Sequence, residues 1–118
     1  MNLLDEFQQH WKIHFAPLLL PKQKVLLALS GGADSTVLAY LLHHSGIPFV
    51  AAHVNYHLRG SESERDEAFV QSFCQIWKIP LLIKNVDTQL YVAQHQLSVQ
   101  VAAREIRYQW FNEIRTTN

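Results

Sequence analysis

The sequence predicts an α/β fold, namely a doubly wound, Rossmann-like parallel sheet with helices on both faces. Three short apolar runs alternate with stretches of helical periodicity, so strand and helix alternate along the chain. The first run, VLLAL at 25–29, is apolar at every position, as expected for a strand covered on both faces. With 48% hydrophobic and 17% charged residues in a chain of 118, the composition supports one core.

The expected elements follow in order. Leu3, Leu4, Phe7 and Trp11 have helical spacing and predict an opening helix over 3–14, which the prolines at 17 and 21 then end. Strands are expected at 25–29, 49–54 and 81–86, and helices at 34–45, 62–78, 88–95 and 98–114. In doubly wound sheets of this kind the strands have the order 3-2-1, and a fourth strand would lie beside the first. No fourth strand is predicted before Asn118, which indicates an incomplete sheet.

Composition excludes several classes of protein. No apolar run approaches the roughly 20 residues that span a bilayer, and the opening MNLLDEFQQHW does not resemble a secretory signal. The lone cysteine, Cys74, cannot form a disulfide framework, so a cytoplasmic location is expected. Ten basic and ten acidic residues give no net charge, so this chain alone is not expected to bind nucleic acid strongly.

The strongest chemical signal is the segment SGGADST at 30–36, between the first strand and the following helix. Adjacent glycines at 31 and 32 let the backbone approach a ligand closely, and the helix N-terminus favours an anion. The segment lacks both the lysine of a Walker A loop and the three spaced glycines of a dinucleotide-binding loop. We therefore expect a phosphate-binding turn in which Asp34 could hold Mg²⁺. The alternative is a plain strand-to-helix turn with a capping side chain.

Two further segments narrow the choice of family. The second strand runs into HVNYHLRG at 53–60, followed by an acidic helix start, and AAREIRY at 102–108 lies in the last helix. Ser-Gly-Gly-x-Asp-Ser resembles the PP-loop of the ATP pyrophosphatase superfamily. All three motifs in this order resemble the tRNA(Ile)-lysidine synthase family. Tyr56 and Gln100 stand where that family commonly has histidine and glutamate.

The resemblance implies a ligase that uses ATP and Mg²⁺ to adenylate the wobble cytidine of tRNA(Ile) and then joins L-lysine to it. It implies that the loop holds pyrophosphate and Mg²⁺, that His53 and Asn55 border the adenosine, and that Arg59 contacts phosphate or RNA. The catalytic residues would be Asp34, Arg104 and Arg107, and Asp34 would also be the metal ligand. The loop residues concerned are Ser30, Gly31, Gly32, Ala33, Asp34 and Ser35.

Other interpretations remain. The chain could be another PP-loop pyrophosphatase, of the tRNA thiolase or amidotransferase type, or a non-catalytic ATP-binding module. The thiolases resemble one another in using cysteine pairs, and this chain has one cysteine. The acidic residues after Gly60 are also explained as a solvated helix start, with Ser61 and Glu64 forming a capping box.

The missing strand and motifs suggest that residues 1–118 are the N-terminal PP-loop domain of a longer enzyme, without its later strands and C-terminal tRNA-binding domains. We then expect weak binding of ATP with Mg²⁺ and no lysine transfer by these residues alone. The apolar first strand would be an exposed edge, so self-association, as a homodimer or a larger assembly, is also expected.

Overall fold

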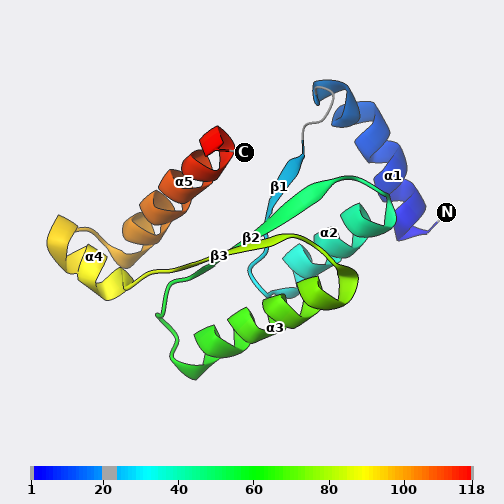
Figure 1. Ribbon diagram of the computed structural model, residues 1–118. Helices are drawn as coiled ribbons and strands as arrows, with labels where there is room; N and C mark the ends of the chain where they lie inside the picture. The colour runs from blue at the N-terminus through cyan, green and yellow to red at the C-terminus, as the bar shows by residue number, and fades with distance from the viewer. Residues whose placement is uncertain (1, 20–23, 118) are drawn as a thin grey trace.

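The computed structural model describes residues 2–19 and 24–117 (Figure 1). The predicted helices and strands are all present, and every bound except one agrees with expectation or differs from it by one residue. The last helix continues three residues beyond the predicted end, and the predicted break at Pro21 lies outside the described residues. The elements are α1 (Leu3–His14), a 3-10 turn (Ala16–Leu18), β1 (Val25–Ala28), α2 (Ala33–His44), β2 (Phe49–Asn55), α3 (Ser61–Trp77), β3 (Leu81–Asn85), α4 (Thr88–His95) and α5 (Val99–Thr117).

The three strands form one parallel sheet in the order β1-β2-β3, as predicted. In register, Ala28 lies opposite Ala52, and Asn55 lies opposite Asn85. The carboxyl ends of all three strands therefore meet at one edge of the sheet, which is where open α/β folds bind ligands. In the part of the chain that is described, β1 has a neighbouring strand on one side only.

The core lies between one face of the sheet and helices α2 and α3. Alternate strand residues such as Leu27 and Ala51 point to this face, where they meet Leu42 of α2 and Val70 of α3. Phe7 and Trp11 of α1 pack against the edge of the same core. This packing fixes the first turns of α2 and α3 beside the carboxyl ends of β1 and β2.

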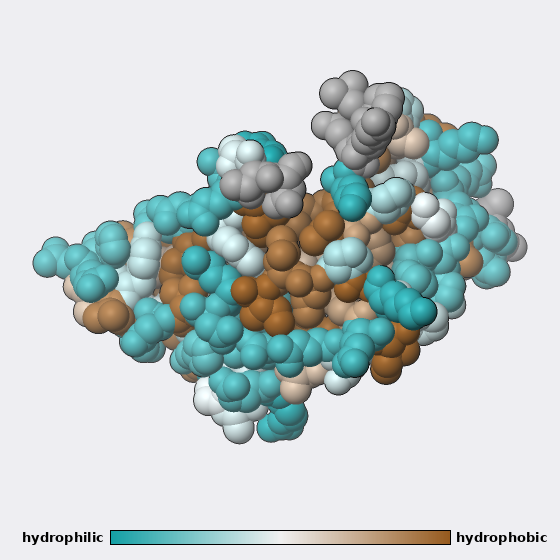
Figure 2. All heavy atoms as spheres, in the orientation of Figure 1, coloured by the Kyte–Doolittle hydropathy of each residue, from teal (hydrophilic) through white to brown (hydrophobic). Residues whose placement is uncertain are grey.

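The other face of the sheet is less covered. On this face Ala28 and Leu82 are exposed, and Leu26 and Val50 are half-buried. Ala52, which lies between Ala28 and Leu82, is buried. Figure 2 shows apolar atoms gathered over the middle of the view, where the strands run in Figure 1. Helix α5 lies on the opposite side of the strands from α3 in Figure 1, after α4. None of the helices within 2–19 and 24–117 is both long and apolar enough to cross a membrane.

Candidate functional site

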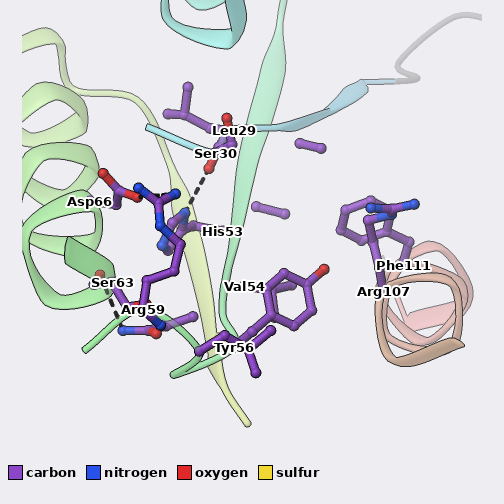
Figure 3. A pocket seen from close by; sticks show the side chains of 14 residues that line it. Leu29, Ser30, His53, Val54, Tyr56, Arg59, Ser63, Asp66, Arg107 and Phe111 are labelled. Atoms are coloured by element: carbon purple, nitrogen blue, oxygen red, sulfur yellow. Dashed lines mark hydrogen bonds and ion pairs between the residues drawn. The ribbon is translucent and has the colours of Figure 1, made fainter. Parts of the chain in front are cut away.

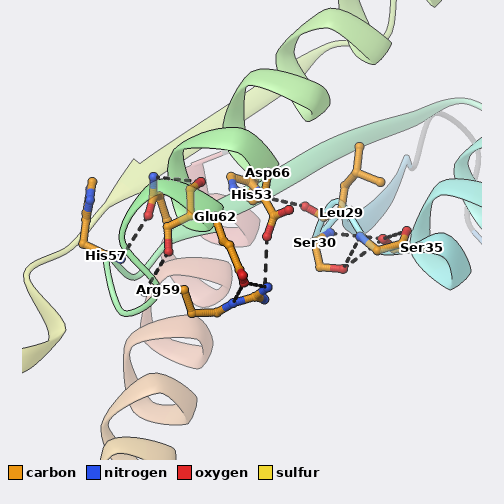
Figure 4. A network of polar contacts seen from close by, with 11 residues as sticks. Leu29, Ser30, Ser35, His53, His57, Arg59, Glu62 and Asp66 are labelled. Carbon is orange, nitrogen blue, oxygen red and sulfur yellow. Dashed lines mark hydrogen bonds and ion pairs between the residues drawn. The ribbon is translucent and has the colours of Figure 1, made fainter.

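The loop after β1 is shaped by its own hydroxyl groups. The Ser30 N–H donates to Ser35 Oγ at 3.1 Å, and the Gly32 N–H donates to Ser30 Oγ at 3.2 Å. The hydroxyls of Ser35 and Thr36 both donate to the Gly32 carbonyl, at 3.2 and 2.8 Å. The two serine oxygens lie 3.1 Å apart (Figure 4). The serines and Thr36 therefore hold the turn in one conformation.

This conformation leaves backbone donors at the start of α2. The first helical backbone bond runs from the Thr36 N–H to the Gly32 carbonyl, at 3.1 Å. The N–H groups of Ala33, Asp34 and Ser35 come before that bond and have no acceptor within the helix. Together with the helix dipole, they form a suitable site for an anion such as a phosphate.

Gly31 has the backbone conformation and the close neighbour that require glycine. Its φ of 90° lies where L side chains are rare, and a Cβ there would come within 3.2 Å of the Asp66 Cβ. The Asp66 carbonyl oxygen would lie 3.4 Å from the same point. The loop is thus packed directly against the second turn of α3.

A cavity of about 300 Å³ opens beside this loop at the carboxyl edge of the sheet (Figure 3). Five predicted site residues line it: Ser30, His53, Asn55, Arg59 and Arg107. The other predicted site residues are not among those that line it, namely Gly31, Gly32, Ala33, Asp34, Ser35 and Arg104. The structure therefore brings together residues from the carboxyl ends of β1 and β2, the loops that follow them, and α5. The other lining residues are Ala28, Leu29, Ala52, Val54, Tyr56, Leu58, Ser63, Asp66 and Phe111.

His53 is 4% exposed and is tied to the residue that precedes the loop. Its Nδ1 lies 2.8 Å from the Leu29 carbonyl oxygen, to which it donates. The other ring nitrogen, Nε2, is buried and has no hydrogen-bond partner among the described residues. Figure 3 shows the ring between Ser30 and Arg59. His53 thus presents one satisfied and one unsatisfied nitrogen at the cavity wall.

Asn55 organises the loop between β2 and α3. Its Oδ1 accepts the His57 N–H at 2.9 Å, and its Nδ2 donates to Glu67 Oε1 at 3.4 Å. His57, with φ of 52°, then bridges Asn85 Oδ1 at 2.8 Å and Glu64 Oε1 at 3.2 Å. The Asn55 side chain is 2% exposed, so its amide is used mainly to hold this loop against α3 and β3.

Arg59 reaches back to the start of α3. Its Nε donates to Glu62 Oε2 at 3.0 Å, and one of its NH groups lies 3.8 Å from Asp66 Oδ2 (Figure 4). Hydrogen bonding and the positive charge of Arg59 lower the pKa of Glu62. The Arg59 side chain is 63% exposed, so it is free to move toward a ligand in the cavity.

The predicted capping box at the start of α3 is wrong. The N-cap is Gly60, with φ of 56°, and no side chain caps the helix. The turn at Gly60 carries Ser61 into the helix, so that its hydroxyl cannot take the N-cap role. Ser63 Oγ instead accepts the Arg59 N–H at 3.1 Å, and Glu64 contacts His57.

Helix α5 supplies the far wall of the cavity. Arg107 and Tyr56 both line the cavity, and Figure 3 shows Arg107 and Phe111 opposite Tyr56. Burial raises the pKa of the Tyr56 phenol, an effect that the nearby charge and hydrogen bond of Arg107 partly offset. Arg104 does not line the cavity, and its guanidinium lies 5.5 Å from the centre of the Tyr108 ring.

Comparison with known proteins identifies the family. The model of the PP-loop domain family matches residues 3–118. The chain belongs to this family. The resemblance predicted from the loop motif is therefore confirmed.

Curated relatives make the likeness to tRNA(Ile)-lysidine synthases specific. This PP-loop chain is 50% identical to the enzyme of Bacteroides thetaiotaomicron over 98 residues, which is 83% of this chain and 23% of that protein. It is 35% identical to the enzyme of Bacillus licheniformis over 117 residues, which is 97% of this chain and 24% of that protein. The chain therefore spans about a quarter of the length of these relatives.

A solved structure confirms the fold. The NH3-dependent NAD synthetase of Campylobacter jejuni superposes with a TM-score of 0.67, over 97% of this chain and 49% of that one. The sequences are 18% identical, so the likeness concerns the PP-loop fold alone. The parallel sheet and its flanking helices are the shared features.

The donors of the PP-loop suit a phosphate with Mg²⁺. Mg²⁺ in nucleotide sites is commonly held by one or two carboxylates together with phosphate oxygens and water. Asp34 is exposed in the first turn of α2, next to the available N–H groups. No group of three or more His, Cys, Asp or Glu side chains suited to a metal occurs among the described residues. Asp34 is therefore suited to a metal ion that phosphate oxygens also coordinate, and not to one that protein side chains coordinate alone.

Two wall residues, Asp66 and Tyr56, were not predicted as site residues. Both could have been found from strand geometry. The first turns of a helix that follows a parallel strand lie near the carboxyl edge, which includes Asp66. Tyr56 lies two residues after Val54, on the sheet face opposite to His53.

Proposed function

We propose that this chain binds ATP with Mg²⁺ and forms the ATP-handling part of a tRNA(Ile)-lysidine synthase. The observation that carries the proposal is the loop from Ser30 to Ser35, which adjoins a cavity at the carboxyl edge of the sheet. The likeness to curated lysidine synthases supports the choice among PP-loop functions. The substrates would be ATP, L-lysine and tRNA(Ile), in the cytoplasm.

The proposed reaction has two steps. In the first, the C2 oxygen of the wobble cytidine attacks the α-phosphorus of ATP, and pyrophosphate leaves. In the second, the ε-amine of lysine attacks C2, and AMP leaves with that oxygen, which gives lysidine. Negative charge grows on the departing pyrophosphate in the first step, so stabilisation of that charge lowers the barrier.

The loop would supply this stabilisation. N–H groups of Ala33, Asp34 and Ser35 would donate to pyrophosphate oxygens, and the glycines at 31 and 32 let the phosphates approach the backbone. The hydroxyl network of Ser30 and Ser35 keeps the donors in place before the ligand arrives. Asp34 would hold Mg²⁺, which neutralises phosphate charge when bound.

Charged groups around the cavity have complementary proposed roles. Arg59 would leave Glu62 to contact a phosphate or RNA, since its side chain is exposed and held only by surface carboxylates. Arg107 would act from the opposite wall, beside Tyr56. Arg104 is one turn away on the same helix, outside the cavity, which favours contact with RNA over contact with ATP.

His53 and Asn55 would border the adenosine in different ways. His53 lines the cavity, and its Nε2 is buried without a hydrogen-bond partner among the described residues. The Asn55 amide already bonds within the protein, so its contribution would be to hold the loop that shapes the adenosine site.

A chimaera tests the proposal. Residues 3–118 would replace the matching segment of the Bacteroides thetaiotaomicron enzyme, to which this chain is 50% identical. We expect ATP-dependent lysine incorporation into tRNA(Ile), and its loss in the Asp34→Ala chimaera. A folded chimaera that binds ATP but transfers no lysine would contradict the lysidine assignment and favour a different PP-loop activity.

A further inference from the structure

The His53 ring has a fixed orientation. Its Nδ1 lies 2.8 Å from the Leu29 carbonyl oxygen, and a carbonyl can only accept, so the proton is on Nδ1. This bond joins β2 to the residue immediately before the loop. The ring therefore cannot turn over without losing a buried hydrogen bond.

The second nitrogen is consequently a fixed acceptor. Nε2 is buried and has no partner within the described residues, and the side chain is 4% exposed. In a neutral imidazole, when one ring nitrogen carries the proton the other is an acceptor. Buried polar atoms in proteins are nearly always hydrogen-bonded. Nε2 thus requires a donor that the described residues do not provide.

The position of the ring suggests which ligand group donates. His53 lines the same cavity as Ser30, the first residue of the loop, and is bonded to the residue before it (Figure 3). In a nucleotide whose phosphates lie on the loop, the ribose is the part next to the phosphates. The exocyclic amine of the base is at the far end of the molecule. A ribose hydroxyl is therefore the donor best placed to reach His53.

We infer that His53 is a specificity-determining residue that accepts a hydrogen bond from a ribose hydroxyl of the bound nucleotide. This inference rests on the proposed ATP site and assigns a chemical group to one of its walls. It predicts that the site distinguishes ribonucleotides from deoxynucleotides, because loss of the donor leaves the buried acceptor unpaired.

Ligand analogues test this without altering the protein. Calorimetry would compare ATP, 2′-deoxy-ATP and 3′-deoxy-ATP, each with Mg²⁺, together with inosine triphosphate, which lacks the exocyclic amine. We expect one deoxy analogue to bind about tenfold more weakly than ATP. Equal binding of ATP and both deoxy analogues would overturn the inference and leave the ATP site intact. Absence of ATP binding would overturn the proposed function as well.

Two variants at His53 test whether its ring causes the preference for ATP over the deoxy analogues. His53→Phe keeps an aromatic ring but has no acceptor, and we expect it to bind ATP and both deoxy analogues equally. His53→Gln can donate to Leu29 and still offer an oxygen, so it should restore part of the preference. If His53→Phe still binds ATP more tightly than a deoxy analogue, the inference is contradicted. It is also contradicted if this variant loses only the preference for ATP over inosine triphosphate.

His95 provides a matched control. Its Nδ1 also bonds to a backbone carbonyl, that of Tyr91 at 3.0 Å, but it lies on α4 outside the cavity. His95→Phe should therefore keep the full preference for ATP. Circular dichroism and thermal unfolding of each variant would separate a change in binding from a change in folding.

Discussion

Gly31 lies against Asp66 so closely that a Cβ in its place would come within 3.2 Å of the Asp66 Cβ. This contact joins the phosphate-binding loop to α3, through two residues that are 35 positions apart in the sequence. Since Asp66 also lines the cavity, the contact sets the position of the loop relative to the cavity wall that α3 forms.

Substitution of Gly31 tests this contact. Gly31→Ala should lower the free energy of unfolding by about 1–3 kcal/mol, because it forces an unfavourable φ and pushes α3 away. Gly46→Ala is the control, since Gly46 has φ of 68° and open space around it. Urea unfolding would compare the two. Equal losses in both variants would show that the contact with Asp66 has no energetic role.

Asn55 should be essential for the conformation of the β2–α3 loop. Asn55→Ala leaves the His57 N–H without its acceptor and should cost about 1–3 kcal/mol in urea unfolding. Asn55→Asp should cost more, because a carboxylate would then face Glu67. Asn112→Ala, at an exposed site on α5, is the control. An unaffected Asn55→Ala variant would contradict the structural role.

Most of the fold could be predicted from the sequence, since apolar periodicity and prolines define each element. The burial of each helix face was harder to predict. By helical spacing, Val37 and Leu38 share an apolar face of α2 with Leu41 and Leu42, yet the first two are 45% and 38% exposed. A pattern identifies apolar positions, but the extent of burial depends on which elements cover them.

The candidate site could be predicted in part. The loop follows from its place after a buried strand, and His53 from its place near the carboxyl end of the next strand. The internal use of the Asn55 amide could not be predicted, because it depends on how the loop turns back to Glu67. Arg104 and Arg107 look equivalent by spacing, but only Arg107 lines the cavity.

The ionisation of Tyr56 should report the closure of the cavity by α5. Burial raises its pKa above the ordinary value of 10.0, so its contribution to stability is complete below that value and is lost as the pH rises through the folded-state pKa. Arg107 acts to lower this pKa, so Arg107→Met should raise it further. Tyrosine ring NMR signals, assigned with Tyr56→Phe, would measure both shifts. A fall in the pKa on removal of Arg107 would contradict the pairing.

The edge of β1 predicts self-association of this chain. Its outer side has no neighbouring strand among the described residues, and apolar side chains of the sheet lie open nearby (Figure 2). Light scattering should show a mass that increases with concentration. Leu26→Lys in β1 should reduce this increase of mass with concentration. Leu18→Lys is the control and should leave it unchanged, because the Leu18 side chain is 75% exposed. A monomer at all concentrations would contradict this prediction.

Binding of ATP with Mg²⁺, measured by calorimetry, tests the central claim most directly. Asp34→Ala removes the proposed metal ligand, and Asp5→Ala removes an acid from the first turn of α1 as a matched control. We predict saturable binding to the 118-residue chain, at least about tenfold weaker in Asp34→Ala and unchanged in Asp5→Ala. No binding, or equal binding by Asp34→Ala, would contradict the assignment of the loop.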